Sequence, residues 1–524
     1  MRRKEYRRWA KELKVRALIR KATLAVAGMA CACAACAADV ITYEEFGAVG
    51  DGKTDDMAAI VAAHAAANEK GLPVRAGDGK TYYIGGGGLT ADIRTDVDFG
   101  TASFVIDDRD VPVKKRETPV FRIQSAAAPV EVKGMSALAS GQKNLGVGLP
   151  GPSLVEVFDD TVRQYKRYGP NRSGGRPKRE VLLAAADGTV DPSTPIIWDY
   201  GKVTRAIAHP LDVKTLVVRG GRFTTIANQE DSWYTYFWRG FAVDRSNVRI
   251  EGVRHDVTGE GKHGAPYWGF VCVSHAANVM VSNCVFTAHK TYRNARGVCM
   301  GSYDINAGYA INVSFVDCRQ TTDINDERYW GIFGSNYCRN LLFDGCVFSR
   351  FDAHMGVANA TIRNSELAYI GTIGFGTFLV ENTTVRSGGT FIGMRGDYGS
   401  SWRGDFIVRN STFAPRKGRK TAPVLLVNGF STDWHDFGYE CFMPRRVVFD
   451  GLVIDDSGLP ENYEGPFVFG MFNEKNTSSD YVEKHPYHVT EEVELRSVTV
   501  KSGRPVRLSP NEWMFRNVKV TRQP

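Results

Sequence analysis

The feature that most constrains this chain is a short segment that recurs along it. Segments such as NVMVSNCVF from Asn278, NVSFVDCRQ from Asn312 and NLLFDGCVF from Asn340 align without gaps. The next copies start at Asn359, Thr377 and Asp405, at steps of 19, 18 and 28 residues. A unit this short cannot bury its own apolar side chains and must stack on its neighbours, so the repeat predicts a solenoid.

Each copy alternates apolar and polar residues and then changes direction. Its second and fourth residues are apolar, as Val279 and Val281 are, which predicts a strand with one buried face. The sixth residue is usually Asn, Gly or Asp, the types that tolerate the left-handed conformation of a one-residue bend. We therefore predict an all-β fold, a right-handed parallel β-helix in which each strand pairs with its copy one coil away.

Two further columns run through the repeat. Cys284, Cys318 and Cys346 follow the bend in successive copies and predict core packing, because no C-x-x-C pair indicates a zinc or disulfide framework. A second ladder with nearly the same steps carries one glycine per copy: Gly297, Gly331, Gly356, Gly374 and Gly393. These glycines are expected to face outward as a bare strip that a sugar chain can approach closely.

The segment FGAVGDGKTDDMAAI, which begins at Phe46, precedes the first coil. Thr54 or Asp55 can cap a helix there, and Met57, Ile60, Val61 and His64 form its apolar stripe. Such a helix would cover the open end of the solenoid. The segment resembles the opening motif of the pectate-lyase superfamily of β-helix proteins, which includes polysaccharide lyases, polygalacturonase-like hydrolases and phage tailspikes. The resemblance implies the fold and leaves the reaction open.

The first 38 residues are predicted to be a signal peptide, followed by a single β-helix domain over residues 39–524. They combine ten Lys or Arg with an apolar run that ends in small residues, so we expect a secreted or periplasmic protein, with a lipoprotein at Cys36 less favoured. Without them, 56 basic and 56 acidic residues remain, and this balance gives no indication of nucleic-acid binding. No other stretch is long and apolar enough to span a membrane.

Residues 135–210 fit the repeat poorly and are predicted to be an insertion, a β-hairpin that walls one end of a groove. They contain the basic run RQYKRYGPNRSGGRPKR from Arg163 to Arg179. This run is either a solvated loop or an anion-binding flap.

The longest loops precede the glycine ladder and are expected to converge beside it. Counted from the start of each copy, His289, Asp323 and Asp352 fall at nearly the same position, which would place them about 5–10 Å apart. The predicted catalytic candidates are His289, Lys290, Arg293, Asp323, Asp326, Tyr329, Asp352 and His354. The predicted substrate-binding candidates are Tyr292, Arg328, Arg395, Asp397, Tyr398 and Trp402, because aromatic rings stack on sugars and Arg binds carboxylates or sulfates.

We favour a polysaccharide lyase that acts on a uronic-acid polymer such as pectin or a glycosaminoglycan. β-Elimination needs a cation that neutralises the uronate carboxylate, a base and an acid. Arg293, Arg328 or Arg395 could be the cation, His354 or His289 the base, and Tyr292, Tyr329 or Tyr398 the acid; Lys290 suits either of the first two roles. A Ca²⁺ ion held by Asp323 and Asp326 is an alternative cation, and no other cofactor or metal is expected.

Two alternatives stay open. A glycoside hydrolase would pair Asp352 with Asp323 or Asp326. The polygalacturonase pattern of Asn-Thr-Asp, Asp-Asp, Gly-His-Gly and Arg-Ile-Lys is absent, however, and TTDIND is only a faint echo of it. A carbohydrate-binding or tailspike-like protein would need the aromatic and arginine side chains but no acid and base. In each case the expected partner is a polysaccharide, and the chain is expected to be a monomer or a homotrimer.

Overall fold

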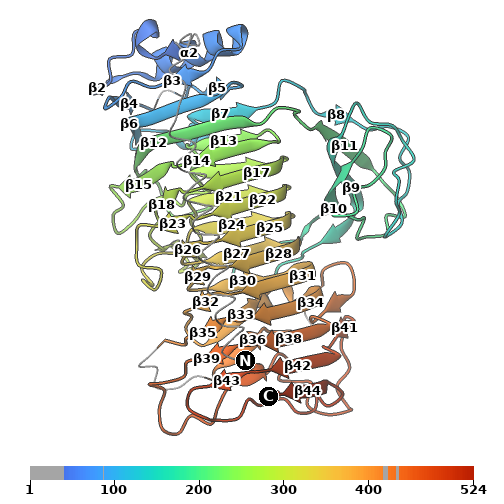
Figure 1. Cartoon of the computed structure of the whole chain (residues 1–524). Coiled ribbons are helices and arrows are strands. Elements are labelled where there is room, and N and C mark those ends of the chain that lie inside the picture. Colours follow the sequence, from blue (N-terminus) through green and yellow to red (C-terminus); the bar gives the residue numbers. More distant parts are fainter. Residues whose placement is uncertain (1–39, 87, 417–422, 432–435) are drawn as a thin grey trace, which may run out of the picture. The chain divides into compact units, whose positions relative to one another are not determined.

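The computed structural model describes residues 40–86, 88–416, 423–431 and 436–524, and the predicted signal peptide lies outside the described residues. Residues 41–524 form one compact unit of stacked coils, the predicted right-handed parallel β-helix (Figure 1). Its strands belong mainly to two large parallel sheets, named sheet A and sheet B here. One coil consists of a sheet B strand and two sheet A strands separated by a bend.

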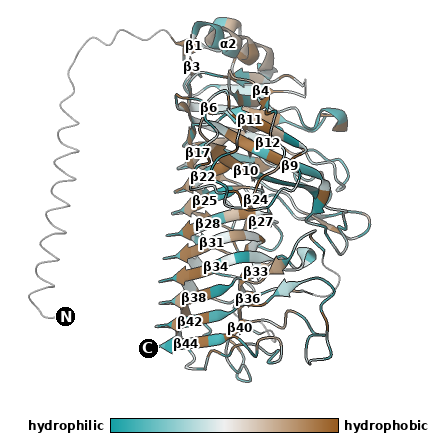
Figure 2. Cartoon of the chain, turned by 90° about the vertical axis from the view of Figure 1, so that its right-hand side faces the viewer, coloured by the Kyte–Doolittle hydropathy of each residue, from teal (hydrophilic) through white to brown (hydrophobic). Residues whose placement is uncertain are grey.

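The strands of each sheet follow one another in chain order. Sheet B contains β5 (Ala91–Ile93), β7 (Phe121–Gln124), β13 (Phe241–Asp244), β16 (Val271–Ser274), β21 (Ile305–Gly308), β24 (Phe333–Asn336), β27 (Phe351–Met355), β30 (Ile370–Thr372), β33 (Thr390–Met394), β36 (Leu425–Asn428) and β40 (Phe467–Phe469). The long row of sheet A contains β6 (Val97–Asp107), β12 (Leu216–Ile226), β14 (Val248–Glu251), β17 (Ala277–Ser282), β22 (Ile311–Val316), β25 (Arg339–Asp344), β28 (Val357–Arg363), β31 (Gly374–Glu381), β34 (Trp402–Arg409), β38 (Arg446–Asp450), β42 (Glu492–Arg496) and β44 (Lys519–Gln523). Figure 2 shows many of these strands one above another, from β17 to β44.

The short row of sheet A follows the bend in each coil. It contains β15 (Arg254–Thr258), β18 (Val285–Phe286), β23 (Arg319–Gln320), β26 (Val347–Phe348), β29 (Glu366–Leu367), β32 (Thr384–Val385), β35 (Thr412–Phe413), β39 (Val453–Ile454) and β43 (Thr499–Val500). The bend is left-handed at Asn283, Asp317 and Asn364, with φ values of 53°, 52° and 52°, as the sequence predicts.

A second left-handed row, which the sequence analysis did not predict, lies near the start of the long sheet A strands. Asn278, Asn312, Asn340 and Asn359 all have positive φ. The side-chain amide of Asn312 donates to that of Asn278 over 2.9 Å, and the amide of Asn340 donates to that of Asn312 over 2.9 Å. This asparagine ladder joins consecutive coils through side chains as well as through strand pairing.

The core lies inside the coils and is rich in phenylalanine. The rings of Phe333 and Phe343 have centroids 4.9 Å apart, and Phe351 packs against both. Cys284, Cys318 and Cys346 are buried in successive coils as free thiols, which confirms their prediction as core residues. Burial of these columns supplies most of the stability that a solenoid gains from stacking.

The N-terminal end is covered by a helix, as predicted. α2 (Met57–Lys70) buries Met57, Ile60, Ala63, His64 and Ala67 against the first strands β1 (Ile41–Thr42), β3 (Val74–Arg75) and β5. It begins after Asp56, one residue beyond the expected cap, and Val61 is only half-buried. β2 (Asp51–Asp55) and β4 (Thr81–Ile84) complete this end. Among the described residues, no helix combines the length and apolar character that crossing a bilayer requires.

The segment between β7 and β12 leaves the coils and forms a separate antiparallel sheet. Its strand order is β10 (Arg176–Ala184), β9 (Ser153–Gln164), β11 (Arg205–Pro210) and β8 (Val130–Glu131). Figure 1 shows this inserted sheet beside the solenoid. Tyr165 and Trp198 of the inserted segment belong to one apolar cluster with Phe375 of β31, so the inserted segment is packed against the coils.

Candidate functional site

A cavity of about 890 Å³ lies on the outer face of sheet B. Residues of β16, β21, β24, β27 and β33 form its floor, so it runs along the stack of coils. The connection between β9 and β10, together with Arg176 at the start of β10, forms one wall. We call this cavity the sheet B pocket.

The floor is not the bare glycine strip that the sequence predicted. Asp352 pairs with Gly334 and Gly371, and Gly371 pairs with Gly393. Gly374 lies instead in sheet A, paired with Val357. The five predicted glycines therefore do not form a single row, and that prediction is wrong.

The glycines of the floor make room for aromatic rings. A Cβ atom on Gly371 would lie 2.6 Å from the ring of Tyr369, and one on Gly334 would lie 3.0 Å from the ring of Tyr303. A substrate would therefore meet aromatic faces rather than bare backbone.

His354 on β27 and Tyr398 form a neutral pair in this pocket. Nδ1 of His354 lies 2.9 Å from the amide oxygen of Asn336, which accepts its proton. Nε2 then carries a lone pair, which accepts from the Tyr398 hydroxyl at 3.4 Å. Burial, followed by the charge of Arg395, lowers the pKa of His354 to about 3, and burial raises the pKa of Tyr398 to about 12. At neutral pH the histidine is an unprotonated base and the tyrosine a protonated acid.

Arg395 holds two carboxylates beside that pair. Its Nη1 donates to Asp352 over 2.8 Å, while Nε and Nη2 donate to the two oxygens of Asp397 over 3.1 and 2.9 Å. Arg167, from the inserted sheet, donates to the same Asp397 over 2.6 Å. Burial alone would raise the pKa of both carboxyls, but Arg395 outweighs it and holds both pKa values below the usual range.

The pocket as a whole is cationic and aromatic. Its charged lining consists of Arg167, Arg172, Arg176, Arg350 and Arg395, opposed by Asp397 alone among the described carboxylates that line it. Arg350 lies between the rings of Trp330 and Tyr369, with centroids 4.2 and 4.3 Å from its guanidinium carbon. Tyr234 and Trp268 add partly exposed rings. Such a lining can pair with anions and stack on the faces of rings.

His289 and Lys290 do not belong to this pocket. His289 is buried between Asp304, at 3.3 Å from its Nε2, and Glu260, at 3.2 Å from its Nδ1. Burial alone would lower the pKa of His289, but these hydrogen bonds outweigh it and raise the pKa to about 9. A histidine that keeps its proton cannot act as the predicted base. Lys290 donates to the Glu260 carbonyl oxygen over 2.8 Å.

The remaining candidates of the two long loops are also outside the pocket lining. Tyr292 is buried, and exposed Arg293 donates to the carbonyl oxygen of Gly297. Tyr329 packs against the core, with the guanidinium of Arg328 over its ring.

The predicted calcium pair does not fit a Ca²⁺ ion. Asp326 is engaged by Arg328 in an ion pair whose arginine is 80% exposed, and exposed Asp323 accepts the backbone N–H of Asn325 over 2.9 Å. Two such carboxylates fall far short of the six to eight oxygen ligands that Ca²⁺ takes.

Trp402 points into the core rather than toward a substrate. It is fully buried on β34, where its indole N–H donates to the Gly376 carbonyl oxygen over 2.9 Å. Its predicted role in substrate binding is therefore wrong. The strand parity of β34 places it on the inner face.

Several residues of the pocket were not predicted from the sequence. Arg350, Asn336 and Tyr369 line the pocket and were not among the candidates. Strand register could have identified Asn336, because β24 and β27 pair directly and bring Asn336 beside Met355, next to His354. The basic run from Arg163 to Arg179 was predicted to be either a solvated loop or an anion-binding flap. Three of its arginines line the pocket, as expected of the flap.

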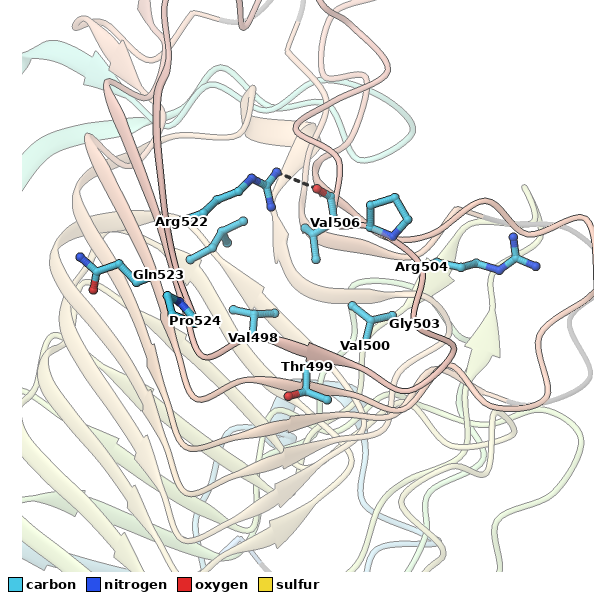
Figure 3. Close-up of a pocket in the computed structure, with 11 residues that line it drawn as sticks. Val498, Thr499, Val500, Gly503, Arg504, Val506, Arg522, Gln523 and Pro524 are labelled. Carbon is cyan, nitrogen blue, oxygen red and sulfur yellow. Dashed lines mark hydrogen bonds between the residues drawn. The ribbon is translucent and has the colours of Figure 1, made fainter.

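A different cavity, of about 590 Å³, lies at the C-terminal coil (Figure 3). Val498, Val500 and Val506 line it, and Arg522 donates to the Val506 carbonyl oxygen over 2.8 Å. Its described lining carries no histidine, cysteine, tyrosine or acidic side chain, so it offers no acid–base pair.

Comparisons with known proteins bear on the fold. No protein-family model matches this sequence, and no curated protein matches it. Among solved structures, the Gp54 tailspike of Acinetobacter baumannii bacteriophage AP22, in complex with a capsular saccharide, is 10% identical, with a TM-score of 0.51 over 92% of this chain and 79% of that one. The tailspike gp49 of Pseudomonas phage LKA1 is 14% identical over 90% and 82% of the two chains, with a TM-score of 0.48.

A third similar structure is the A-module of the Azotobacter vinelandii mannuronan C-5 epimerase AlgE6. It is 11% identical over 92% of this chain and 99% of that chain, with a TM-score of 0.39. At 10% identity, the AP22 tailspike, whose TM-score is 0.51, indicates a shared fold and nothing finer. This chain therefore has the fold of the parallel β-helix proteins, and its membership of the pectate-lyase superfamily stays a prediction.

Proposed function

We propose that this chain is a carbohydrate-active enzyme that cleaves an acidic polysaccharide by β-elimination in the sheet B pocket. The observation that carries the proposal is the neutral His354, which accepts the Tyr398 hydroxyl beside Arg395. The cationic and aromatic lining supports a uronate polymer as the substrate. The AP22 tailspike, of similar fold, is in complex with a capsular saccharide, so a protein of this fold can hold a saccharide.

In this mechanism the uronate carboxylate faces Arg395 and Arg350, whose charge stabilises the carbanion that forms next to it. Nε2 of His354 takes the proton at C5, the C4–O bond breaks, and a C4=C5 double bond forms. Tyr398 gives its hydroxyl proton to the departing oxygen. The imidazolium and the phenolate that result are hydrogen-bond neighbours, so one proton transfer between them restores the starting state.

The hydrolase alternative fits this pocket less well. Asp352, its expected centre, is fully buried and bound to Arg395, and its predicted partners Asp323 and Asp326 are outside the pocket lining. A glycosidase needs one carboxyl that keeps a proton near neutral pH. Asp352 and Asp397 both have lowered pKa values and are ionised there.

Incubation of the purified protein with pectate, alginate and glycosaminoglycans tests the proposal. β-Elimination produces both new reducing ends and the ultraviolet absorbance of an unsaturated uronate, whereas hydrolysis produces reducing ends alone. Binding without either product would assign the chain to the carbohydrate-binding alternative. Reducing ends without ultraviolet absorbance, on any polymer that is cleaved, would refute the lyase. The predicted signal peptide implies export, so polymers from outside the cytoplasm come first.

A further inference from the structure

Two histidines and a glutamate meet where the inserted sheet contacts the coils, on residues that the sheet B pocket does not use. Glu156 lies on β9, His209 on β11, and His275 between β16 and β17. One potential ligand atom from each lies within 4.8 Å of the other two. Among the described residues this is the one such group of three or more His, Cys, Asp or Glu side chains.

Strand pairing brings the first two residues together. Glu156 pairs with Ile207, and His209 pairs with Leu154, in the antiparallel ladder between β9 and β11. Glu156 and His209 are therefore diagonal neighbours on the same face of the inserted sheet. The coils supply the third residue, since the ring of His275 stacks on that of His209 with centroids 5.0 Å apart.

The polar atoms of this cluster lie close together, and one of them lacks a hydrogen-bond partner among the residues described. Nδ1 of His275 lies 2.8 Å from the Ser274 hydroxyl, and its Nε2 lies 3.3 Å from Glu156 Oε2. Nε2 of His209 is shielded from solvent and has no hydrogen-bond partner within the described part of the chain. A buried nitrogen without a partner is unfavourable, and a cation bound at its lone pair would satisfy it.

We propose that Glu156, His209 and His275 bind a divalent transition-metal ion of the Zn²⁺ type. Two imidazole nitrogens and one carboxylate oxygen form a donor set that suits Zn²⁺ and disfavours Ca²⁺. Arg179 donates to the other oxygen of Glu156 over 3.2 Å and the Ser274 contact fixes the His275 ring, so both ligands are oriented by neighbours. The adjoining cavity of about 450 Å³, which His209, His275 and Asp244 line, leaves room for a water as the fourth ligand.

Such an ion would join the inserted sheet to the solenoid at the base of β9. The same strand leads to Tyr165 and Arg167 in the wall of the sheet B pocket. The ion would therefore anchor that wall without entering the pocket. The inference does not depend on which reaction the pocket performs.

Calorimetric titration of the tag-free full chain, stripped with a chelator, tests the proposal with Zn²⁺ as the probe. We expect one equivalent to bind and to raise the melting temperature. His209→Gln and His275→Asn each remove one imidazole, and Asn tolerates the left-handed conformation of position 275. Each variant should bind Zn²⁺ more than about tenfold more weakly and lose the thermal shift. Ca²⁺ should not compete.

A matched control is His263→Gln, which removes an exposed imidazole that pairs with exposed Asp231. This variant should bind Zn²⁺ as the wild type does. The metal-free variants should melt near the metal-free wild type, which separates lost binding from lost folding. A wild type that binds no stoichiometric Zn²⁺ would show a plain His–Glu ion pair and overturn the proposal. Equal binding by the wild type and the two cluster variants would also overturn it, by locating the ion elsewhere.

Discussion

Arg395 shows how single side chains set the chemistry of the sheet B pocket. It binds Asp352 and Asp397 at once, and its charge helps keep His354 unprotonated. The sequence predicted Asp352, His354, Arg395, Asp397 and Tyr398 as candidates, and the structure brings these five together. Residue type and loop position selected these five, but the same criteria also selected His289 and Arg293, which lie outside the pocket lining.

Replacement of His354 by Gln should lower kcat on a uronate polymer by about 10²–10⁴-fold, because the base of the proposed elimination is lost. The ultraviolet rate of product formation measures the effect. His488→Gln, which changes an exposed imidazole that pairs with Glu440, should keep the wild-type rate. An active His354 variant beside an inactive Asp352→Asn would instead favour the hydrolase.

The variable lengths of the loops between strands explain why some predicted site residues lie elsewhere. β26 ends at Phe348 and β27 begins at Phe351, so this coil closes after two residues, whereas the coil before it has a loop over residues 321–332. Counting from the repeat start aligned Asp352 with the loop residue Asp323, although Asp352 lies inside a strand. The repeat fixes the register of sheet A, but loops of variable length hide the register of sheet B from any fixed count.

The wall of the pocket provides a test at this scale. Changing exposed Arg172 and Arg176 together to Gln should raise KM for a uronate polymer by about tenfold, equivalent to about 1.4 kcal/mol, and leave kcat nearly unchanged. The reason is that both cations lie on the wall and attract the polymer without touching His354 or Tyr398. KM should also lose part of its salt dependence. Arg516→Gln, a change to an exposed arginine in the last coil, is the control, and a double variant with wild-type KM would contradict the flap.

The asparagine ladder provides a second test. Asn340→Ala removes three side-chain hydrogen bonds, to Asn312, Asn359 and the Ser193 carbonyl oxygen. It also puts a Cβ-bearing residue without a local hydrogen bond into a left-handed conformation. We expect the free energy of unfolding to fall by about 2–3 kcal/mol. Asn340→Gly should cost about 1 kcal/mol less, because glycine adopts this conformation freely. Urea unfolding measures both, and equal losses would mean that backbone conformation contributes nothing.

At the scale of the whole molecule, buried histidines predict a stability maximum slightly below neutral pH. Burial lowers the pKa of His64 to about 3 in the folded protein, whereas a histidine in the unfolded chain has a pKa of about 6.5. His64 therefore takes nothing from the free energy of unfolding above about pH 6.5 and lowers it progressively as the pH falls toward 3. His289 has the opposite sign: its pKa is raised to about 9, so its stabilisation is complete below about 6.5 and is lost as the pH rises through 9.

Thermal melts between about pH 4 and pH 9 check this. His64 alone should cost about 3 kcal/mol between pH 6.5 and pH 4. His64→Phe keeps an aromatic ring at that position and should flatten the acid side of the curve, while His289→Gln should flatten the alkaline side. A melting temperature that rises steadily up to pH 9 would exclude the assigned protonation of His289.

The direction of the sheet B pocket has a consequence for substrate length. Its floor draws on strands from β16 to β33, six consecutive coils, and strands lie about 4.8 Å apart, which is comparable to the length of one sugar ring. The floor is therefore about 24 Å long, and each coil spans roughly the length of one sugar ring. The affinity for oligosaccharides shorter than the floor should fall with each sugar ring that is missing. Addition or deletion of one coil during evolution would lengthen or shorten the preferred polymer.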